Sequence, residues 1–212
     1  MSVPRHPLSS PRAERTRATI VRAATRLFGA AGYAQVSMDK VATEAAVTKP
    51  TVYAHFGSKT ALFETLISDV IVRSHGAELA PARSVEEVGE AMFEWSRNRL
   101  DWLLADETVG LMRAASAEGI RRPEWAQNLL GEFDFGAMER WLADLDDADI
   151  LDVRSPAEAA SLFTALTKGA LFYPVLVAGE PITPKPDRDV LIREAVRVFL
   201  AAYSPTSSHN PP

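Results

Sequence analysis

Apolar residues recur along this chain at intervals of three and four residues, and this spacing constrains the fold more than any other feature. The first such stripe lies within residues 13–31 and consists of Ile20, Ala23, Ala24, Leu27 and Phe28. The spacing places these side chains on one face of an α-helix. Nowhere do β-branched and polar residues alternate over the length of a strand. The chain is therefore predicted to be all-α.

Turn and capping signals divide the chain into three short helices followed by a body of longer ones. We expect a first helix over 13–31 ended by Gly32, a second over 38–45 capped by Ser37, and a third that starts after Thr48. A fourth helix continues from Lys59 to His75. The later helical segments are expected near 84–105, 107–119, 123–144, 156–178 and 186–203. Pro174 lies inside one of these segments and is expected to kink or divide it.

Composition excludes several classes of protein. The 212 residues are 47% hydrophobic, which is enough to bury a sizeable core, and the chain has no cysteine for disulfides or thiolate metal sites. No run approaches the ~20 apolar residues of a membrane span, and the N-terminus lacks the apolar core of a signal peptide. We expect a cytoplasmic protein that does not enter a membrane.

Charge is unevenly distributed along the chain. Residues 1–60 contain nine Lys or Arg against three acidic residues, a net charge of +6, whereas the remainder contains fourteen against twenty-five, a net charge of −11. A basic end on an acidic body favours a polyanionic partner for that end. A solvated basic face explains the charge equally well at this point.

The stretch "VTKPTVYAHFGSK", residues 47–59, is too polar for an ordinary buried helix. A helix that begins after Thr48 and has Pro50 in its first turn would turn Val52 and Phe56 inward. The side chains left outside are Lys49, Pro50, Thr51, Tyr53, Ala54 and His55, with Lys59 just beyond the helix. Such a surface suits the DNA major groove, although a solvated helix in a bundle has the same pattern.

Residues 17–67, "RATIVRAATRLFGAAGYAQVSMDKVATEAAVTKPTVYAHFGSKTALFETLI", resemble the DNA-binding domain of the TetR family of bacterial transcriptional regulators. The resemblance rests on Leu27-Phe28, Gly32-Tyr33, Ser37, Val41-Ala42 and above all "TKPTVYAHFGSKTALF". It implies a helix-turn-helix domain over 13–60 and a ligand-binding and dimerisation domain over 61–203. The ends, a basic arm over 1–12 and a tail over 204–212, are expected to be disordered.

The resemblance also implies roles for single residues in binding double-stranded DNA. Ser37 would meet a phosphate at a helix N-terminus, and Thr48 would cap the recognition helix. Base edges would be read by Lys49, Pro50 and Thr51. Backbone contacts would come from Tyr53, His55 and Lys59.

Three positions depart from the pattern of the family. Ala46 stands where glycine is common, so a left-handed conformation there would cost on the order of 1 kcal/mol. Pro50 and Ala54 replace residues that commonly supply contacts to DNA. These departures affect the preferred base sequence and leave the mode of binding unchanged.

For the body, the resemblance implies a small-molecule effector site and a homodimer interface formed by the last two helices. Apolar pockets between bundle helices are usual ligand sites, although core packing explains each aromatic residue as well. Our pocket candidates are Met92, Trp95, Met112, Trp125, Asn128, Phe133, Met138 and Phe163.

An enzyme is not expected, and neither a cofactor nor a metal ion is implied. The four histidines are scattered at positions 6, 55, 75 and 209, and no glycine-rich phosphate loop or nucleophile elbow occurs. The sequence thus predicts a homodimeric repressor released from a palindromic operator by a small apolar or amphipathic molecule. The alternative is a helical small-molecule-binding protein without sequence-specific DNA function.

Overall fold

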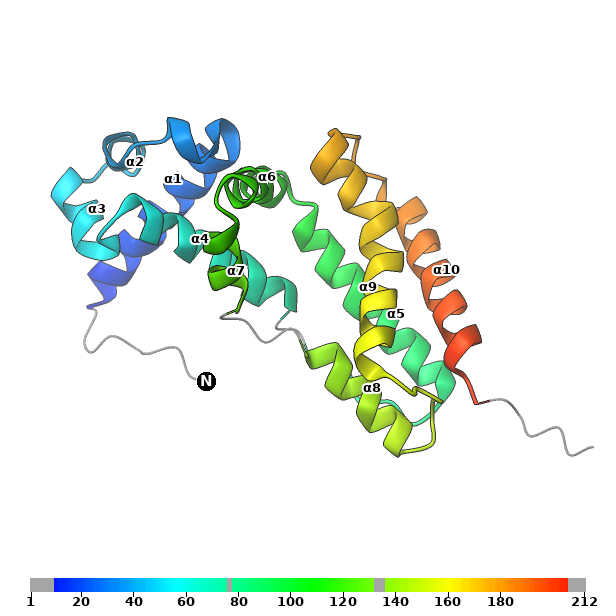
Figure 1. Cartoon of the computed structure of the whole chain (residues 1–212). Helices are drawn as coiled ribbons and strands as arrows, with labels where there is room; N and C mark the ends of the chain where they lie inside the picture. The colour runs from blue at the N-terminus through cyan, green and yellow to red at the C-terminus, as the bar shows by residue number, and fades with distance from the viewer. Residues whose placement is uncertain (1–9, 76–77, 132–135, 206–212) are drawn as a thin grey trace, which may run out of the picture. The chain divides into compact units, whose positions relative to one another are not determined.

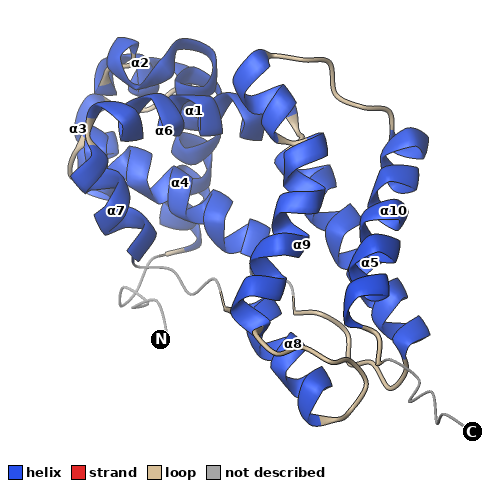
Figure 2. Cartoon of the chain, turned by 45° about the vertical axis from the view of Figure 1, so that its right-hand side comes forward, coloured by secondary structure: helices blue, strands red, loops and turns tan. Residues whose placement is uncertain are grey.

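The computed structural model of the chain describes residues 10–75, 78–131 and 136–205, and every regular element in those ranges is a helix (Figure 2). The all-α prediction is confirmed. The helices, labelled in Figure 1, are α1 (Pro11–Gln35), α2 (Met38–Glu44), α3 (Lys49–Phe56), α4 (Lys59–His75), α5 (Val85–Leu103), α6 (Asp106–Arg121), α7 (Pro123–Gly131), α8 (Ala137–Asp147), α9 (Pro156–Leu171), the π-helix η1 (Pro174–Ala178) and α10 (Lys185–Tyr203). None of these described helices combines the length and apolar content needed to cross a bilayer.

The helices form two compact units. The head unit comprises the described parts of residues 1–70 and 106–129, and the body unit comprises those of 71–105 and 130–212. The head therefore contains α6 and most of α7 in addition to α1–α3 and most of α4. The domain boundary predicted between residues 60 and 61 leaves α6 and α7 out of the head, because these two helices begin more than forty residues after it.

α6 joins the head unit through a close approach to α1. A Cβ atom added at Gly110 would lie 2.8 Å from the backbone oxygen of Gly29 and 3.0 Å from its Cα atom. The backbones of the two helices are therefore almost in contact at this point, and only glycine fits at Gly110. Contacts between α1 and α6 are the most extensive between any two helices of the described chain.

The two ends of α1 differ from the sequence prediction. The Ser10 hydroxyl accepts a hydrogen bond of 3.3 Å from the Ala13 backbone N–H, so the helix begins at Pro11 and residues 10–12 do not belong to the disordered arm that was expected. Gly32, with φ 75°, interrupts the helix as predicted, but a further turn extends it to Gln35. Residues 1–9 of the predicted arm and 206–212 of the predicted tail lie outside the described residues.

The body unit is built around α5, α9 and α10, with α8 packed on α9 (Figure 1). The rings of Phe163 and Phe199 meet edge to face at 5.3 Å between α9 and α10, and both are fully buried. Ion pairs join α5 to α10, and one of their residues, Arg188, is buried. They are Asp101 with Lys185 at 2.8 Å, Asp101 with Arg188, and Glu90 with Arg193 at 3.1 Å.

Proline and glycine lie at some of the helix boundaries in the second half of the chain. α9 ends at Leu171 and Pro174 begins η1, so the predicted division of this segment is confirmed. A proline in a helix interior removes a hydrogen bond and clashes with the preceding turn. The single helix expected over 123–144 is wrong, because the structure has α7 and α8 there, with Gly136 as the N-cap of α8.

The contact between α1 and α6 predicts opposite outcomes for two glycine substitutions. Gly110→Ala should lower the free energy of unfolding by about 1–3 kcal/mol, because the new methyl group meets backbone atoms that cannot move aside. Gly29→Ala should change it by less than about 1 kcal/mol and in the stabilising direction, because its methyl group meets nothing closer than 3.4 Å and alanine favours a helix. Urea denaturation of the full chain measures both, and equal effects would contradict the described crossing.

Candidate nucleic-acid interface

α2 and α3 are joined by a tight turn that depends on a left-handed residue. The Val47 backbone N–H donates to the Ala42 carbonyl at 3.0 Å, and the Ala46 N–H donates to the Thr43 carbonyl at 3.1 Å. This pair of hydrogen bonds is a Schellman motif, which requires a positive φ at the residue after the C-cap. That residue is Ala46, with φ 52°. The left-handed conformation whose cost the sequence analysis considered is present, and an alanine rather than a glycine adopts it.

α3 begins sharply because two groups define its first turn. The Thr48 hydroxyl accepts a hydrogen bond of 3.4 Å from the Thr51 backbone N–H and also lies 2.8 Å from the Thr51 hydroxyl. Pro50 occupies a first-turn position, where its missing N–H leaves no acceptor unsatisfied. Gly57, with φ 72°, then ends the helix. Both ends of this eight-residue helix are thus fixed by local geometry.

Only two side chains of α3 are buried. Val52 and Phe56 face the core of the head unit, as the sequence predicts. The outward surface consists of the exposed Lys49, Pro50, Tyr53 and Ala54 together with the half-buried Thr51 and His55. Tyr53 leaves 43% of its surface exposed, which is unusual for a large aromatic residue on a helix of this size.

Lys49 is held at the start of α3 by an acidic residue of α2. Its Nζ atom lies 2.9 Å from Oδ2 of Asp39, and both side chains are largely exposed. The hydrogen bond and the charge of Asp39 raise the pKa of Lys49 above its ordinary value. A base edge or a phosphate that meets Lys49 must therefore compete with Asp39, a partner that the sequence analysis did not identify.

Lys59 lies against the end of α1. Its Nζ atom is 4.3 Å from the centre of the Tyr33 ring and donates a hydrogen bond of 3.4 Å to the Ala34 carbonyl. Partial burial lowers the pKa of Lys59, and the charge of Glu118 opposes this shift. The N-cap of α4, Ser58, accepts from the Ala61 backbone N–H at 3.1 Å. Lys59 is thus the first residue of α4, and its amine lies against the end of α1.

An aromatic cluster supports this corner of the head unit. The Phe63 ring lies 4.9 Å from that of Phe28, 5.0 Å from that of Tyr33 and 5.9 Å from that of Trp125. The Tyr33 hydroxyl shares a hydrogen bond of 2.8 Å with the hydroxyl of Thr60. The cluster therefore ties α1, α4 and α7 together directly behind Lys59.

Basic side chains of the head unit outnumber the acidic groups available to them. Glu44 pairs with Arg26 at 2.8 Å, as Asp39 does with Lys49. The basic residues that form no ion pair with another residue of the described 10–60 range are Arg12, Arg15, Arg17, Arg22, Lys40 and Lys59. Ser37, the predicted phosphate contact, caps α2 in their midst through a hydrogen bond of 3.2 Å from the Lys40 N–H. Such an excess of positive charge attracts a polyanion.

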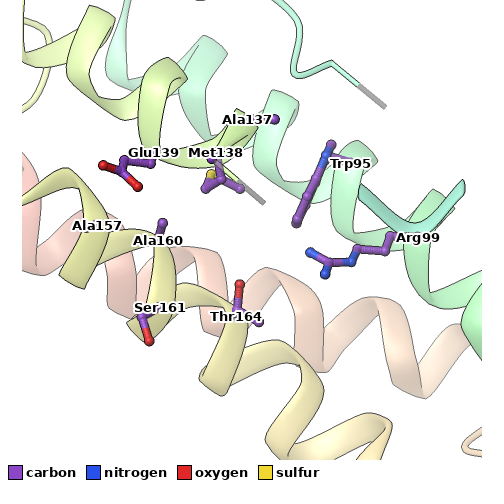
Figure 3. Close-up of a pocket in the computed structure, with 10 residues that line it drawn as sticks. Trp95, Arg99, Ala137, Met138, Glu139, Ala157, Ala160, Ser161 and Thr164 are labelled. Atoms are coloured by element: carbon purple, nitrogen blue, oxygen red, sulfur yellow. The ribbon is translucent and has the colours of Figure 1, made fainter. Parts of the chain in front are cut away.

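The predicted pocket residues fall in different parts of the structure. Trp95 and Met138 line a cavity of about 360 Å³ in the body unit (Figure 3). Met92 and Phe163 are fully buried in that unit, and Phe133 lies outside the described residues. The remaining three, Met112, Trp125 and Asn128, belong to the head unit, where the indole N–H of Trp125 donates to Glu64 at 2.8 Å.

Comparison with known proteins agrees with the geometry. Residues 20–66 match the model of bacterial regulatory proteins of the tetR family, and residues 90–205 match that of the C-terminal domain of AefR-like transcriptional repressors. The chain belongs to the TetR family. This is a family of transcriptional regulators and not of enzymes. The resemblance inferred from residues 17–67 is thereby confirmed.

Two solved structures extend this likeness over most of the chain. A structure from Pseudomonas syringae pv. tomato is 26% identical with a TM-score of 0.76, and the match covers 91% of this chain and 99% of that one. The flavonoid-responsive regulator FrrA is 28% identical with a TM-score of 0.67, and the match covers 92% and 100%. The HTH-type transcriptional regulator SrpR of Pseudomonas putida is 34% identical over 82 residues. That match spans 38% of this chain and 37% of the length of the curated relative.

Sequence reasoning missed two kinds of residue at these sites. The sequence analysis counted Asp39 only as a charge. Asp39 becomes the partner of Lys49 because α2 and α3 pack next to each other. Arg99, in the middle of α5, also lines the cavity of Trp95 and Met138. No signal in the sequence separates a buried arginine on a helix from a solvated one.

The left-handed turn predicts that Ala46→Gly stabilises the chain. Glycine adopts a positive φ without the steric cost of a Cβ atom, so the free energy of unfolding should rise by about 1 kcal/mol. The matched change Ala54→Gly, at an exposed helical position, should lower it by about 0.5–1 kcal/mol. Chemical denaturation distinguishes the two, and a loss of stability in both variants would contradict the strain assigned to Ala46.

Proposed function

We propose that the chain is a homodimeric transcriptional repressor that binds a palindromic operator through α3 and is released from it by a small molecule. It acts in the bacterial cytoplasm as a regulator and not as an enzyme. The observation that carries this proposal is the outward surface of α3, which is largely polar and exposed. It belongs to the family's DNA-binding domain, where six basic residues form no ion pair within the described residues 10–60.

The geometry of the head unit supports a division of roles among its side chains. Thr51 and Lys49 lie at the N-terminal turn of α3, from which a recognition helix contacts base edges. Ser37 and Lys59 lie at the N-termini of α2 and α4, where the helix dipole adds to a phosphate contact. Tyr53 and His55 extend the outward surface toward the sugar-phosphate backbone. Pro50 offers no backbone donor, so hydrogen bonds to bases must come from its neighbours.

Repression and release by an effector are supported by the body unit and the relatives. The model matched by residues 90–205 is named for a transcriptional repressor, and FrrA is named as flavonoid-responsive. The body unit contains a cavity of suitable size for a small organic molecule. An effector can release the operator only by its different affinity for the DNA-binding and the released states.

Dimerisation is supported by exposed apolar side chains on the last helices. Most of the large apolar side chains that the described residues expose lie on or near α9, η1 and α10. They are Leu162, Tyr173, Val177, Ile182, Val190, Leu191 and Val198. Exposed apolar side chains gathered on one part of a protein are usual where two protein copies meet. A two-fold axis there would present two copies of α3 to half-sites roughly 34–36 Å apart.

Selection from a pool of randomised duplexes tests this function, because it requires no assumption about the sequence of the operator. The proposal predicts an enriched inverted repeat, and a gel shift with that repeat should show two chains per duplex. DNA from upstream of the gene for this protein provides a second substrate. Failure of both to yield a specific complex would favour the alternative, a helical protein that binds small molecules without sequence-specific DNA function.

Lys59→Gln should weaken binding to all DNA sequences alike. The negative slope of log affinity against log salt concentration should become less steep by about one unit. Glutamine retains part of the aliphatic stem over Tyr33, so the aromatic cluster keeps its packing while the charge is lost.

Arg154→Gln is the matched control, because it removes one exposed positive charge from the body unit. Its slope should equal that of the unchanged protein. Fluorescence anisotropy over a range of salt concentrations measures all three slopes. If Lys59→Gln and Arg154→Gln gave the same slope, Lys59 would not be a phosphate contact.

A further inference from the structure

An ion pair joins the first turn of α2 to the first turn of α3 within the head unit. Lys49 is the first residue of α3, and its Nζ atom lies 2.9 Å from Oδ2 of Asp39, the second residue of α2. At least half of each of the two side chains is exposed. Asp39 therefore belongs to the same exposed surface as the start of α3, although it lies on another helix.

The fold itself does not depend on this contact. An exposed ion pair contributes little to the free energy of unfolding, because water and salt screen the attraction between its charges. Asp39 also stabilises the first turn of α2 through the helix dipole, and that effect requires no partner on α3. The consequences of the contact are therefore to be sought at the DNA surface.

Both groups of the pair retain hydrogen-bonding capacity. A lysine ammonium has three N–H donors, and Lys49 uses one of them on Asp39. A carboxylate accepts through both oxygens, and Oδ1 of Asp39 receives no hydrogen bond from any residue that the structure describes. The pair thus presents a donor and an acceptor side by side, on atoms 2.9 Å apart.

A G·C base pair presents the complementary order of groups in the major groove. Guanine offers the acceptors N7 and O6, and cytosine offers its N4 amino group as a donor beside them. Lys49 can therefore donate to guanine while Asp39 accepts from cytosine. An A·T pair in the same orientation places the N6 donor of adenine toward Lys49 and the O4 acceptor of thymine toward Asp39. Both of these contacts are repulsive.

The DNA backbone is a poor ligand for the same pair. Asp39 cancels the charge of Lys49, so the pair as a whole releases no counterion when it meets a phosphate. A phosphate bound by Lys49 also lies close to the carboxylate of Asp39, and the two negative charges repel each other. This repulsion acts against non-operator DNA, which is bound mainly through phosphates. A ligand that satisfies both groups at once avoids the competition between Asp39 and DNA for Lys49.

We propose that Asp39 determines the DNA specificity of the chain together with Lys49, and that the pair reads one G·C base pair in each half-site as a unit. The inference rests on the proposed function, because it assigns a base pair to the start of α3. Asp39 acts in two ways: it accepts a hydrogen bond from cytosine N4, and it keeps Lys49 from binding phosphates.

Two simpler roles for Asp39 make different predictions. If Asp39 acts only through the dipole of α2, its loss lowers stability and leaves the preferred base sequence unchanged. If it acts only as a negative charge near DNA, its loss raises the affinity for all sequences alike. In that case loss of Glu44, the other acidic residue of α2, has the same kind of effect.

Selection from randomised duplexes with four forms of the full chain distinguishes these roles. The forms are the unchanged chain, Lys49→Gln, Asp39→Ala and Glu44→Ala. Glu44 is the matched control, because it is an exposed acidic residue of α2 that pairs with Arg26 at 2.8 Å. We expect the unchanged chain and Glu44→Ala to require a G·C pair at one position of each half-site. Asp39→Ala and Lys49→Gln should lose this requirement.

Fluorescence anisotropy measures the size of the effect. Replacement of that G·C pair by A·T in both half-sites should weaken binding by the unchanged chain and by Glu44→Ala at least about tenfold. The same replacement should weaken binding by Asp39→Ala or Lys49→Gln less than about threefold. The double variant should behave like either single variant, because two partners in one contact do not contribute additively.

The salt dependence of binding to a duplex without the inverted repeat tests the second action of Asp39. In Asp39→Ala the charge of Lys49 is no longer cancelled. The negative slope of log affinity against log salt concentration should then become steeper by about one unit for each chain bound. Addition of Lys49→Gln should restore the slope of the unchanged chain. A slope that stays steep in the double variant would contradict the action of Asp39 through Lys49.

A G·C requirement that persists in Asp39→Ala or in Lys49→Gln would overturn the proposal, and so would additive losses in the double variant. Asp39→Asn, which keeps the shape of the side chain, takes the place of Asp39→Ala if circular dichroism shows the alanine variant to be unfolded.

The outcome is separable from that of the proposed function. If the chain selects an inverted repeat in which no base preference depends on Asp39, the repressor stands and the role of Asp39 is wrong. If the unchanged chain selects no specific duplex, both the proposed function and this inference are wrong.

Discussion

Packing of Phe63 against three other aromatic rings holds the head unit together. Phe28, Tyr33 and Trp125 come from α1 and α7, and all three meet the one ring that α4 supplies. Three short helices bury too little apolar surface to be stable alone. The cluster and the near contact of Gly29 with Gly110 pack α4, α6 and α7 together with these three helices. The rest of the head depends on this packing because α3 itself contributes only Val52 and Phe56 to the core.

Because so few of its side chains are buried, α3 keeps the rest exposed for the DNA contact that we propose. A helix anchored by two side chains can turn the others outward, and its direction is set by the turn at Ala46 and the cap at Thr48. The body unit shows the converse arrangement, since its helices bury aromatic rings fully and place the buried Arg99 against a cavity. In the head unit positive charge faces outward, where a polyanion can reach it. In the body unit the buried positive charge faces inward, where only a small molecule fits.

Local signals predicted the fold and the inward and outward faces of α3 well. Ser37, Thr48, Gly32 and Pro174 act through their own backbone geometry, which sequence reveals directly, and the periodicity of Val52 and Phe56 identified the inward face of α3. Contacts between distant segments were not predictable in this way. The pairing of Gly29 with Gly110, the division of 123–144 into two helices and the placement of Arg99 against a cavity depend on tertiary packing. The pocket residues were chosen from helical stripes, and a stripe does not distinguish a cavity wall from a filled core.

Protection of a single cysteine by DNA tests the central claim, that the outward surface of α3 binds the operator. The chain has no cysteine, so Ala54→Cys on α3 and Glu180→Cys in the body unit each introduce the only reactive thiol. Reaction with a maleimide should slow at least tenfold at position 54 when the selected operator is bound, and it should be unchanged at position 180. An unchanged rate at position 54 in a preparation that gel shift shows to be fully DNA-bound would contradict the account.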